Sequence, residues 1–195
     1  MKIGALVRSY HGTWYLKEVL RQFSHLDKVL VLNCRFAGLS ELPDDTEEVV
    51  KELNQDNVEL IKLSPREEHE VLNAGLTLLE DFDHVYICDA DEFFTKQDLV
   101  EILKVGLTSD IVICKYVDVY DEKHIYEPRD HMPIVMIKPK INFYKTRCAS
   151  GETKEAKVTM KHYGLIKTDW KEEYWDTGTS HILELKKRQL IRWDR

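Results

Sequence analysis

No apolar run in this 195-residue sequence approaches the length of about 20 residues that a membrane-spanning helix needs. The apolar run at positions 3–7 near the N-terminus also gives way to polar residues too early for the apolar region of a signal peptide. We therefore expect a protein without a transmembrane segment that is made and kept in the cytoplasm.

Cysteines are few, and none is spaced as a metal or redox motif. The four cysteines lie far apart without a CxxC pair, and Cys34, Cys88 and Cys114 sit at or in apolar, strand-like runs. Such residues act as small core side chains, which argues against a zinc site or a disulfide framework.

Positive charge is also scarce. The chain carries 28 basic and 35 acidic residues, a formal net charge of −7. Because nonspecific nucleic-acid binding needs an electropositive surface that displaces counterions, we expect no nucleic-acid partner. The single basic cluster, at 186–195, is interpreted as a solvated helix face, with contact to an anionic membrane or ligand as the alternative.

The residues that are present predict a single α/β domain. Hydrophobic residues make up 43% of the chain, enough to bury one core. Apolar runs of strand length alternate with segments of helical period, which is typical of β-α-β units and a largely parallel sheet. Strands are expected at 3–7, 28–32, 58–63 and 84–88, and helices at 14–23 and 44–55, with Asp45 as the N-cap of the latter.

Two further helix starts carry capping signals. Ser64, Pro65 and Glu67 fit an N-cap, a first helical residue and a capping box. Thr95 and Asp98 form a second such pair. Beyond residue 108 strand-like segments follow one another without long helices between them, which indicates a mixed second half. We expect a nucleotide-binding half (1–95), an acceptor half (96–165) and a C-terminal helical tail (166–195).

The fourth expected strand ends in the acids of VYICDADEFFT. Ligands of open α/β sheets bind at the carboxyl ends of the strands, so Asp89 and Asp91 should face a ligand. In an extended segment, residues two apart point to one side, which lets both carboxylates hold one divalent cation and, through it, phosphate oxygens. The alternative, that they only cap the next helix, is weaker because Thr95 supplies that cap. Glu92 is interpreted either as a support for the metal site or acceptor, or as an acid that favours the helix start.

This region resembles the DXD segment of GT-A-fold glycosyltransferases, particularly family 2-like enzymes. The resemblance includes an Asn-x-Gly-Leu helix about fifteen residues earlier, matched by Asn73, Gly75 and Leu76, and the KHYG at 161–164. It implies a three-layer GT-A-like α/β/α fold with a mixed, mostly parallel sheet. It also implies a UDP- or GDP-linked sugar donor and a divalent cation, Mn²⁺ or Mg²⁺. Asp89 would lie near the ribose and sugar while also binding the metal, and Asp91 would be the main metal ligand. His162 would be a third ligand, with a purely structural role for this lone histidine as the alternative.

The same resemblance suggests donor contacts. At the first-strand exit Ser9 and Tyr10 would contact the base and ribose. Arg66 would reach the donor, with a surface ion pair as the alternative. The second-strand exit departs from the family pattern, because Asn33 stands where an acidic residue is usual. Asn33 can still hydrogen-bond a base, but the identity of the nucleotide stays open.

Transfer to an acceptor hydroxyl with inversion needs a carboxylate base, since an alcohol does not ionise at neutral pH. Family 2-like enzymes take that base from the half after DXD. The acceptor would be a glycan, protein or lipid. Glu152 is the first choice for the base, and the other candidates are Asp118, Asp121, Asp130 and Glu155.

Three other functions remain open. A haloacid-dehalogenase-type phosphatase also places Asp-x-Asp after a strand, but Phe93 stands where that class has Thr or Val. A nucleotidyltransferase is a second alternative, although no Gly-rich basic loop follows the first strand. The third is a catalytically idle sugar-binding domain, against which the retained DXD argues.

Overall fold

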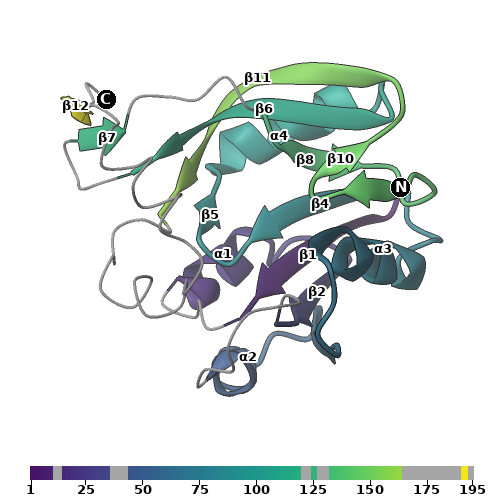
Figure 1. Ribbon diagram of the computed structural model, residues 1–195, viewed down its shortest axis with the longest axis vertical. Coiled ribbons are helices and arrows are strands. Elements are labelled where there is room, and N and C mark those ends of the chain that lie inside the picture. Colours follow the sequence, from purple (N-terminus) through teal and green to yellow (C-terminus); the bar gives the residue numbers. More distant parts are fainter. Residues whose placement is uncertain (11–14, 36–43, 120–123, 127–131, 164–189, 193–195) are drawn as a thin grey trace.

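An eight-stranded mixed sheet forms the middle of the computed structural model, which describes residues 1–10, 15–35, 44–119, 124–126, 132–163 and 190–192 (Figure 1). The strand order is β3-β2-β1-β4-β8-β6-β11-β5. The first four strands of this order run parallel to one another. They and their connecting helices are β1 (Ile3–Ser9), α1 (Leu16–Gln22), β2 (Lys28–Asn33), α2 (Thr46–Leu53), β3 (Val58–Lys62), α3 (Glu68–Leu78) and β4 (His84–Asp89).

The other half of the sheet is mixed. Strand β8 (Ile134–Ile137) runs antiparallel between β4 and β6 (Ile111–Asp118). Strand β11 (Thr153–His162) is parallel to β6, and short β5 (Glu92–Phe93) is antiparallel to β11. Helix α4 (Lys96–Gly106) connects β5 to β6. The described residues also form two small strand pairs: β9 (Phe143–Lys145) with β10 (Cys148–Ala149), and β7 (His124–Tyr126) with β12 (Leu190–Arg192).

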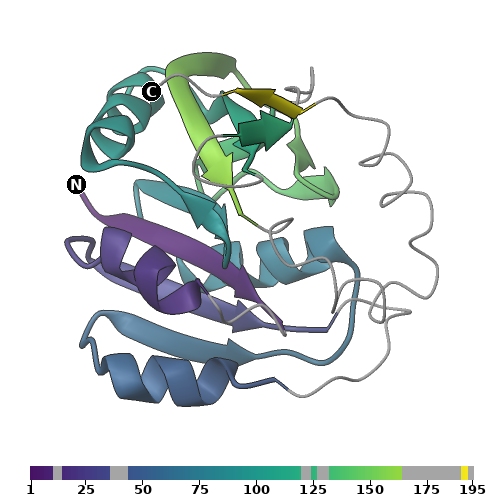
Figure 2. The same cartoon turned by 90° about the vertical axis from the view of Figure 1, so that its left-hand side faces the viewer.

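Helices cover both faces of the sheet. The alternating side chains of β1 show the division, because Ala5 and Val7 pack into the cluster with α1 and α4, whereas Leu6 packs with α3. Helices α1, α2 and α4 therefore form one layer, while α3 and the β9–β10 hairpin cover the opposite face (Figures 1 and 2). The predicted three-layer α/β/α architecture with a mixed, mostly parallel sheet is confirmed.

Local predictions at the helix starts have different outcomes. At α4 the Asp98 N–H donates to Thr95 Oγ1 (3.1 Å) and the Thr95 N–H to Asp98 Oδ2 (2.8 Å), which confirms that capping box. The Ser64 prediction is wrong. Helix α3 begins at Glu68, and the Glu67 N–H donates to Glu70 Oε2 (3.0 Å). The Ser64 hydroxyl instead accepts from Arg66 (2.9 Å), so it does not cap a helix.

The expected helical tail is wrong where the structure describes it. Leu190–Arg192 is strand β12, paired antiparallel with β7. The rest of 166–195 lies outside the described residues. The prediction for the cysteines is confirmed in part, since Cys34, Cys88 and Cys114 are buried free thiols. Among the described helices, none combines the length and the apolar character that crossing a membrane requires.

Gly75 lets α3 lie close to the sheet. A Cβ atom at this position would come within 2.8 Å of Leu32 Cδ1 and of Leu6 Cδ2, and both of these side chains are fully buried. The backbone of α3 therefore approaches β1 and β2 more closely than an alanine would permit. This close approach explains physically why a glycine stands in the Asn-x-Gly-Leu segment.

Gly75→Ala should lower the free energy of unfolding by up to about 2 kcal/mol. Overpacking a core ordinarily costs about 1–3 kcal/mol, which outweighs the gain of about 1 kcal/mol in helix propensity. Thr77→Ala, at an exposed position of the same helix, is the control and should stabilise by about 0.5 kcal/mol. Urea unfolding measures both, and a Gly75→Ala variant as stable as Thr77→Ala would contradict the packing account.

Candidate functional site

The carboxyl edge of the sheet has a point where the chain changes direction. From β1 the chain runs outward through β2 to β3, and then returns to the other side of β1 as β4. In open α/β sheets a ligand crevice forms at such a switch point. The strand ends that meet there carry Arg8 and Ser9 on β1, Asn33 on β2 and Asp89 on β4.

Strand register brings the polar residues of this edge together. Arg8 pairs with Asp89, and Ser9 with Asn33. Farther along the sheet, His162 pairs with Asp118 on one side and with Glu92 on the other. The polar residues thus form two groups of cross-strand neighbours, one on β2, β1 and β4 and the other on β6, β11 and β5.

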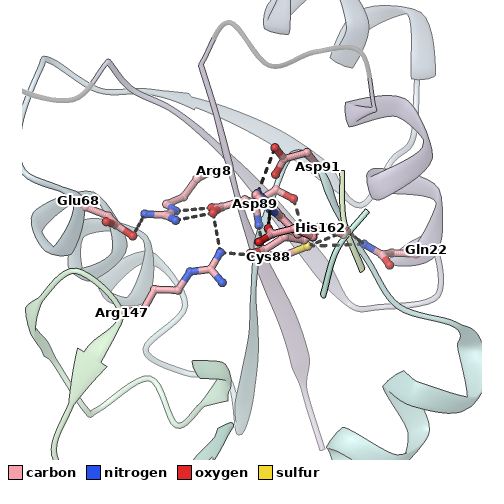
Figure 3. Close-up of polar contacts among 10 residues, drawn as sticks. Arg8, Gln22, Glu68, Cys88, Asp89, Asp91, Arg147 and His162 are labelled. Carbon is pink, nitrogen blue, oxygen red and sulfur yellow. Dashed lines mark hydrogen bonds and ion pairs between the residues drawn. The ribbon is translucent and has the colours of Figure 1, made fainter. Parts of the chain in front are cut away.

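Asp89 is held by two arginines (Figure 3). Arg8 binds it with Nε to Oδ1 (2.6 Å) and Nη2 to Oδ2 (2.7 Å), and Arg147 adds Nη2 to Oδ2 (2.8 Å). Arg8 also pairs with Glu68 on α3. Burial alone would raise the pKa of Asp89, but the Arg147 and Arg8 guanidiniums outweigh it and hold that pKa well below its usual range. Asp89 is therefore an ionised anchor.

This geometry does not match the expected metal role of Asp89. Both of its oxygens are engaged by guanidiniums, and residues 90–91 form a turn after β4, so the alternation expected of an extended segment does not apply. Asp89 and Asp91 consequently face different partners. Arg8 is buried beside Asp89.

Asp91 faces His162. Its Oδ2 lies 3.5 Å from His162 Nε2, while His162 Nδ1 bonds Asp118 Oδ1 at 2.7 Å. Asp91 and His162 are 25% and 23% exposed, whereas Asp118 is buried. Burial lowers the pKa of His162, but Asp91 and Asp118 outweigh this and raise it to about 9. In this arrangement the imidazolium directs one N–H toward each carboxylate.

Glu92 closes the turn that carries Asp91. Its Oε2 accepts from the Asp89 N–H (2.7 Å) and from Arg147 Nη2 (2.7 Å), and burial raises its pKa. On the other face of the sheet Gln22 donates to the Glu92 carbonyl (3.1 Å) and accepts from the Phe94 N–H (2.9 Å). Glu92 therefore holds the backbone in place, which differs from both of the roles considered for it.

The charges of the site do not balance. Arg8, Arg147 and His162 supply three positive charges against five carboxylates, which leaves an excess of two negative charges when all five carboxylates are ionised. The five carboxylates are those of Glu68, Asp89, Asp91, Glu92 and Asp118. Among the described residues no three His, Cys, Asp or Glu side chains converge as a complete metal cluster. A divalent cation beside Asp91 fits the charge, with His162 as the second protein ligand.

A second polar cluster lies at the ends of β1 and β2. Ser9 Oγ is 2.9 Å from Thr46 Oγ1, which donates to Asp44 Oδ1 (2.7 Å). Asn33 Nδ2 donates to Asp44 Oδ2 (2.5 Å). An acidic residue, Asp44, therefore does lie beside Asn33, but it comes from the segment before α2. The sequence pattern did not reveal it because Asp44 is 11 residues from Asn33 along the chain.

Tyr10 and Arg66, the other two predicted donor contacts, lie at the end of β1 and in the turn before α3. Tyr10 directly follows β1 and is half-buried. Arg66 bonds within its own turn, to the Ser64 carbonyl (3.1 Å) and hydroxyl (2.9 Å).

The favoured base, Glu152, is far from this site. It precedes β11, and its carbonyl accepts from the N–H of Ile111 at the start of β6. The 10 residues of β11 separate it from His162 by about 30 Å at 3.3 Å per residue. Glu155, on the same strand, is exposed. Asp118 reaches the site but is buried against His162, and Asp121 and Asp130 lie outside the described residues.

The sequence matches no model of a known protein family, and no curated protein matches it either. Solved structures with a similar chain arrangement include S. aureus TarS 1–349 (TM-score 0.48, 21% identity, 63% of this chain and 37% of that one). The same protein in complex with UDP-GlcNAc has a TM-score of 0.47 and 20% identity, over 64% of this chain and 39% of that one. A third similar structure is glucosyl-3-phosphoglycerate synthase from Mycobacterium tuberculosis in complex with Mn²⁺, UDP and phosphoglyceric acid. Its TM-score is 0.48 and its identity 16%, over 59% of this chain and 43% of that one. The present chain thus spans about two fifths of these proteins.

Asp89→Asn should lower the free energy of unfolding at pH 7 by about 3 kcal/mol, because two buried guanidiniums lose a charged partner. The folded pKa of Asp89 lies below the unfolded value of about 3.9, so its contribution is complete above about pH 5 and is lost as the pH falls toward the folded pKa. The difference between the variant and the wild type should therefore shrink from pH 5 to pH 2 in urea unfolding.

Asp81→Asn is the control for this experiment. Asp81 pairs with Lys2 at an exposed position, where an ion pair contributes little. It should leave the stability at pH 7 nearly unchanged. A loss in Asp89→Asn that is the same at pH 7 and pH 2 would show that the carboxylate charge is not its cause.

Proposed function

We propose that this protein is a glycosyltransferase that moves a sugar from a nucleoside-diphosphate donor to an acceptor hydroxyl with the help of a divalent cation. The observation that carries the proposal is the Asp91–His162 pair at the carboxyl edge of the sheet. It lies beside the switch point where a nucleotide would bind, and the site has an excess of negative charge.

The donor nucleoside would lie over the ends of β1 and β2. Ser9 and Asn33 offer hydrogen-bonding groups there, and Asp44 fixes Nδ2 of Asn33 as the donor of their shared bond, since a carboxylate only accepts. Tyr10 would stack on the base. A UDP- or GDP-linked sugar is the donor class we propose.

Asp91 and His162 would hold Mn²⁺ or Mg²⁺ together with the diphosphate oxygens of the donor. A bound divalent cation stabilises the negative charge that develops on the leaving nucleoside diphosphate. His162 would bind through Nε2 after losing the proton there, while Asp118 keeps the Nδ1 proton and the orientation of the ring. Asp89 would act by holding the turn in place.

The acceptor would be a hydroxyl of a glycan, protein or lipid, and inversion remains part of the proposal. Glu152 is not retained as the base because of its distance from His162. Asp121 and Asp130 remain candidates from the sequence. The division at residue 95 into a donor half and an acceptor half is less sharp than expected, because Arg147 and His162 both contact the donor side.

The phosphatase alternative is disfavoured by the same geometry. A haloacid-dehalogenase-type enzyme uses the first aspartate as a nucleophile. Here both oxygens of Asp89 are bonded to guanidiniums. A carboxylate held in this way is a poor nucleophile.

Asp91→Asn should weaken Mn²⁺-dependent binding of UDP or GDP at least about tenfold and leave the fold intact, because the amide is a much poorer ligand for a hard cation. Calorimetry with and without Mn²⁺ measures the effect. Asp56→Asn removes the same charge at an exposed turn and should bind like the wild type. Equal Mn²⁺-dependent affinities for Asp91→Asn and the wild type would overturn the metal assignment, and no nucleotide binding by the wild type would overturn the function.

A further inference from the structure

The turn that carries Asp91 is fastened by a residue distant in sequence. Arg147 Nη2 bonds Glu92 Oε2 (2.7 Å) and Asp89 Oδ2 (2.8 Å), and the same Glu92 oxygen accepts from the Asp89 N–H (2.7 Å). One guanidinium thus ties the two ends of the segment 89–92 together. Asp91 is inside that segment, so its position depends on this closure.

Arg147 is itself held in place by its hairpin. It occupies the two-residue turn between β9 and β10, next to Thr146 with φ 37°. A β-branched residue in the left-handed region is strained, and such strain persists only where the surroundings enforce it. The Arg147 side chain is 6% exposed, so its guanidinium is committed to the turn and not to solvent.

Asn73 on α3 anchors this hairpin. Its Nδ2 donates to the Phe143 carbonyl (2.8 Å) and its Oδ1 accepts from the Phe143 N–H (2.8 Å). The side-chain amide therefore pairs with the first residue of β9 as a neighbouring strand would. Phe143 is buried in the cluster that contains Leu72 and Leu76, which adds packing to the two hydrogen bonds.

We propose that Arg147 is the positioning residue of the donor site, and that Asn73 sets the hairpin that delivers it. The inference rests on the proposed function, because it assigns Arg147 to the control of Asp91. From one side the hairpin fixes the segment 89–92 through Arg147, and from the other side Gln22 of α1 fixes its backbone. The carboxylate of Asp91 is thereby held toward His162 before any ligand binds.

The test compares Arg147→Met with Lys145→Met. Both remove one positive charge from the same hairpin, but the Lys145 side chain is exposed whereas that of Arg147 is buried. The probes are UDP and GDP, each titrated with and without Mn²⁺. Arg147→Met should lose about tenfold or more of the Mn²⁺-dependent affinity and keep the weak metal-independent binding. Arg147→Lys should recover part of the loss, because an ammonium can pair with one carboxylate at a time. Lys145→Met should match the wild type.

A double-variant cycle separates positioning from direct contact. If Arg147 acts through the closed turn, the losses in Arg147→Met and Glu92→Gln should not add in the double variant. Additive losses would mean that Arg147 contacts the donor itself, which overturns the positioning role. Equal Mn²⁺-dependent affinities for Arg147→Met and Lys145→Met would overturn it as well.

Asn73 provides a second route if Arg147→Met does not fold. Asn73→Asp keeps the acceptor for the Phe143 N–H but loses the donor to its carbonyl. It should lower the Mn²⁺-dependent affinity about threefold or more with an intact fold, and wild-type affinity would contradict the anchoring. If wild type and Lys145→Met bind neither nucleotide, the proposed function has failed, whereas the failure of the positioning role alone leaves their binding intact.

Discussion

The ion pairing of Asp89 with Arg8 and Arg147 is the interaction on which the candidate site depends. Arg8 comes from the first strand, Asp89 from the fourth and Arg147 from a hairpin in the second half of the chain. A buried guanidinium is tolerated only with a charged or hydrogen-bonding partner close by. The three segments therefore meet in the folded chain, and their meeting places the turn that carries Asp91.

The two aspartates of the DXD segment consequently have different roles. Both side chains are partly exposed, but the oxygens of Asp89 are engaged by two arginines, which stabilises the fold, whereas Asp91 faces His162. Side chains from both halves of the chain hold the turn that carries the Asp91 carboxylate. Such an arrangement orients that carboxylate before a ligand arrives, which lowers the cost of binding.

The local features of the fold could be predicted from the sequence. The apolar runs predicted the strands of the first half, and Thr95 with Asp98 predicted the start of α4, because both signals are local in the chain. Arg147 and Asp44 carried no such signal, since their partners are distant along the chain or across a loop. Glu152 was expected at the site but lies at the opposite end of β11 from His162. The order of residues along the chain does not show which end of a strand lies at the site.

Crystals soaked with Mn²⁺ and UDP or GDP would test the central claim most directly, by anomalous scattering at the manganese edge. We predict an anomalous peak beside the Asp91 carboxylate and His162 Nε2, next to the diphosphate, with the Asp89 carboxylate still bonded to Arg8 and Arg147. A manganese ion bound to Asp89 in place of the arginines, or a bound nucleotide diphosphate without manganese, would contradict the account.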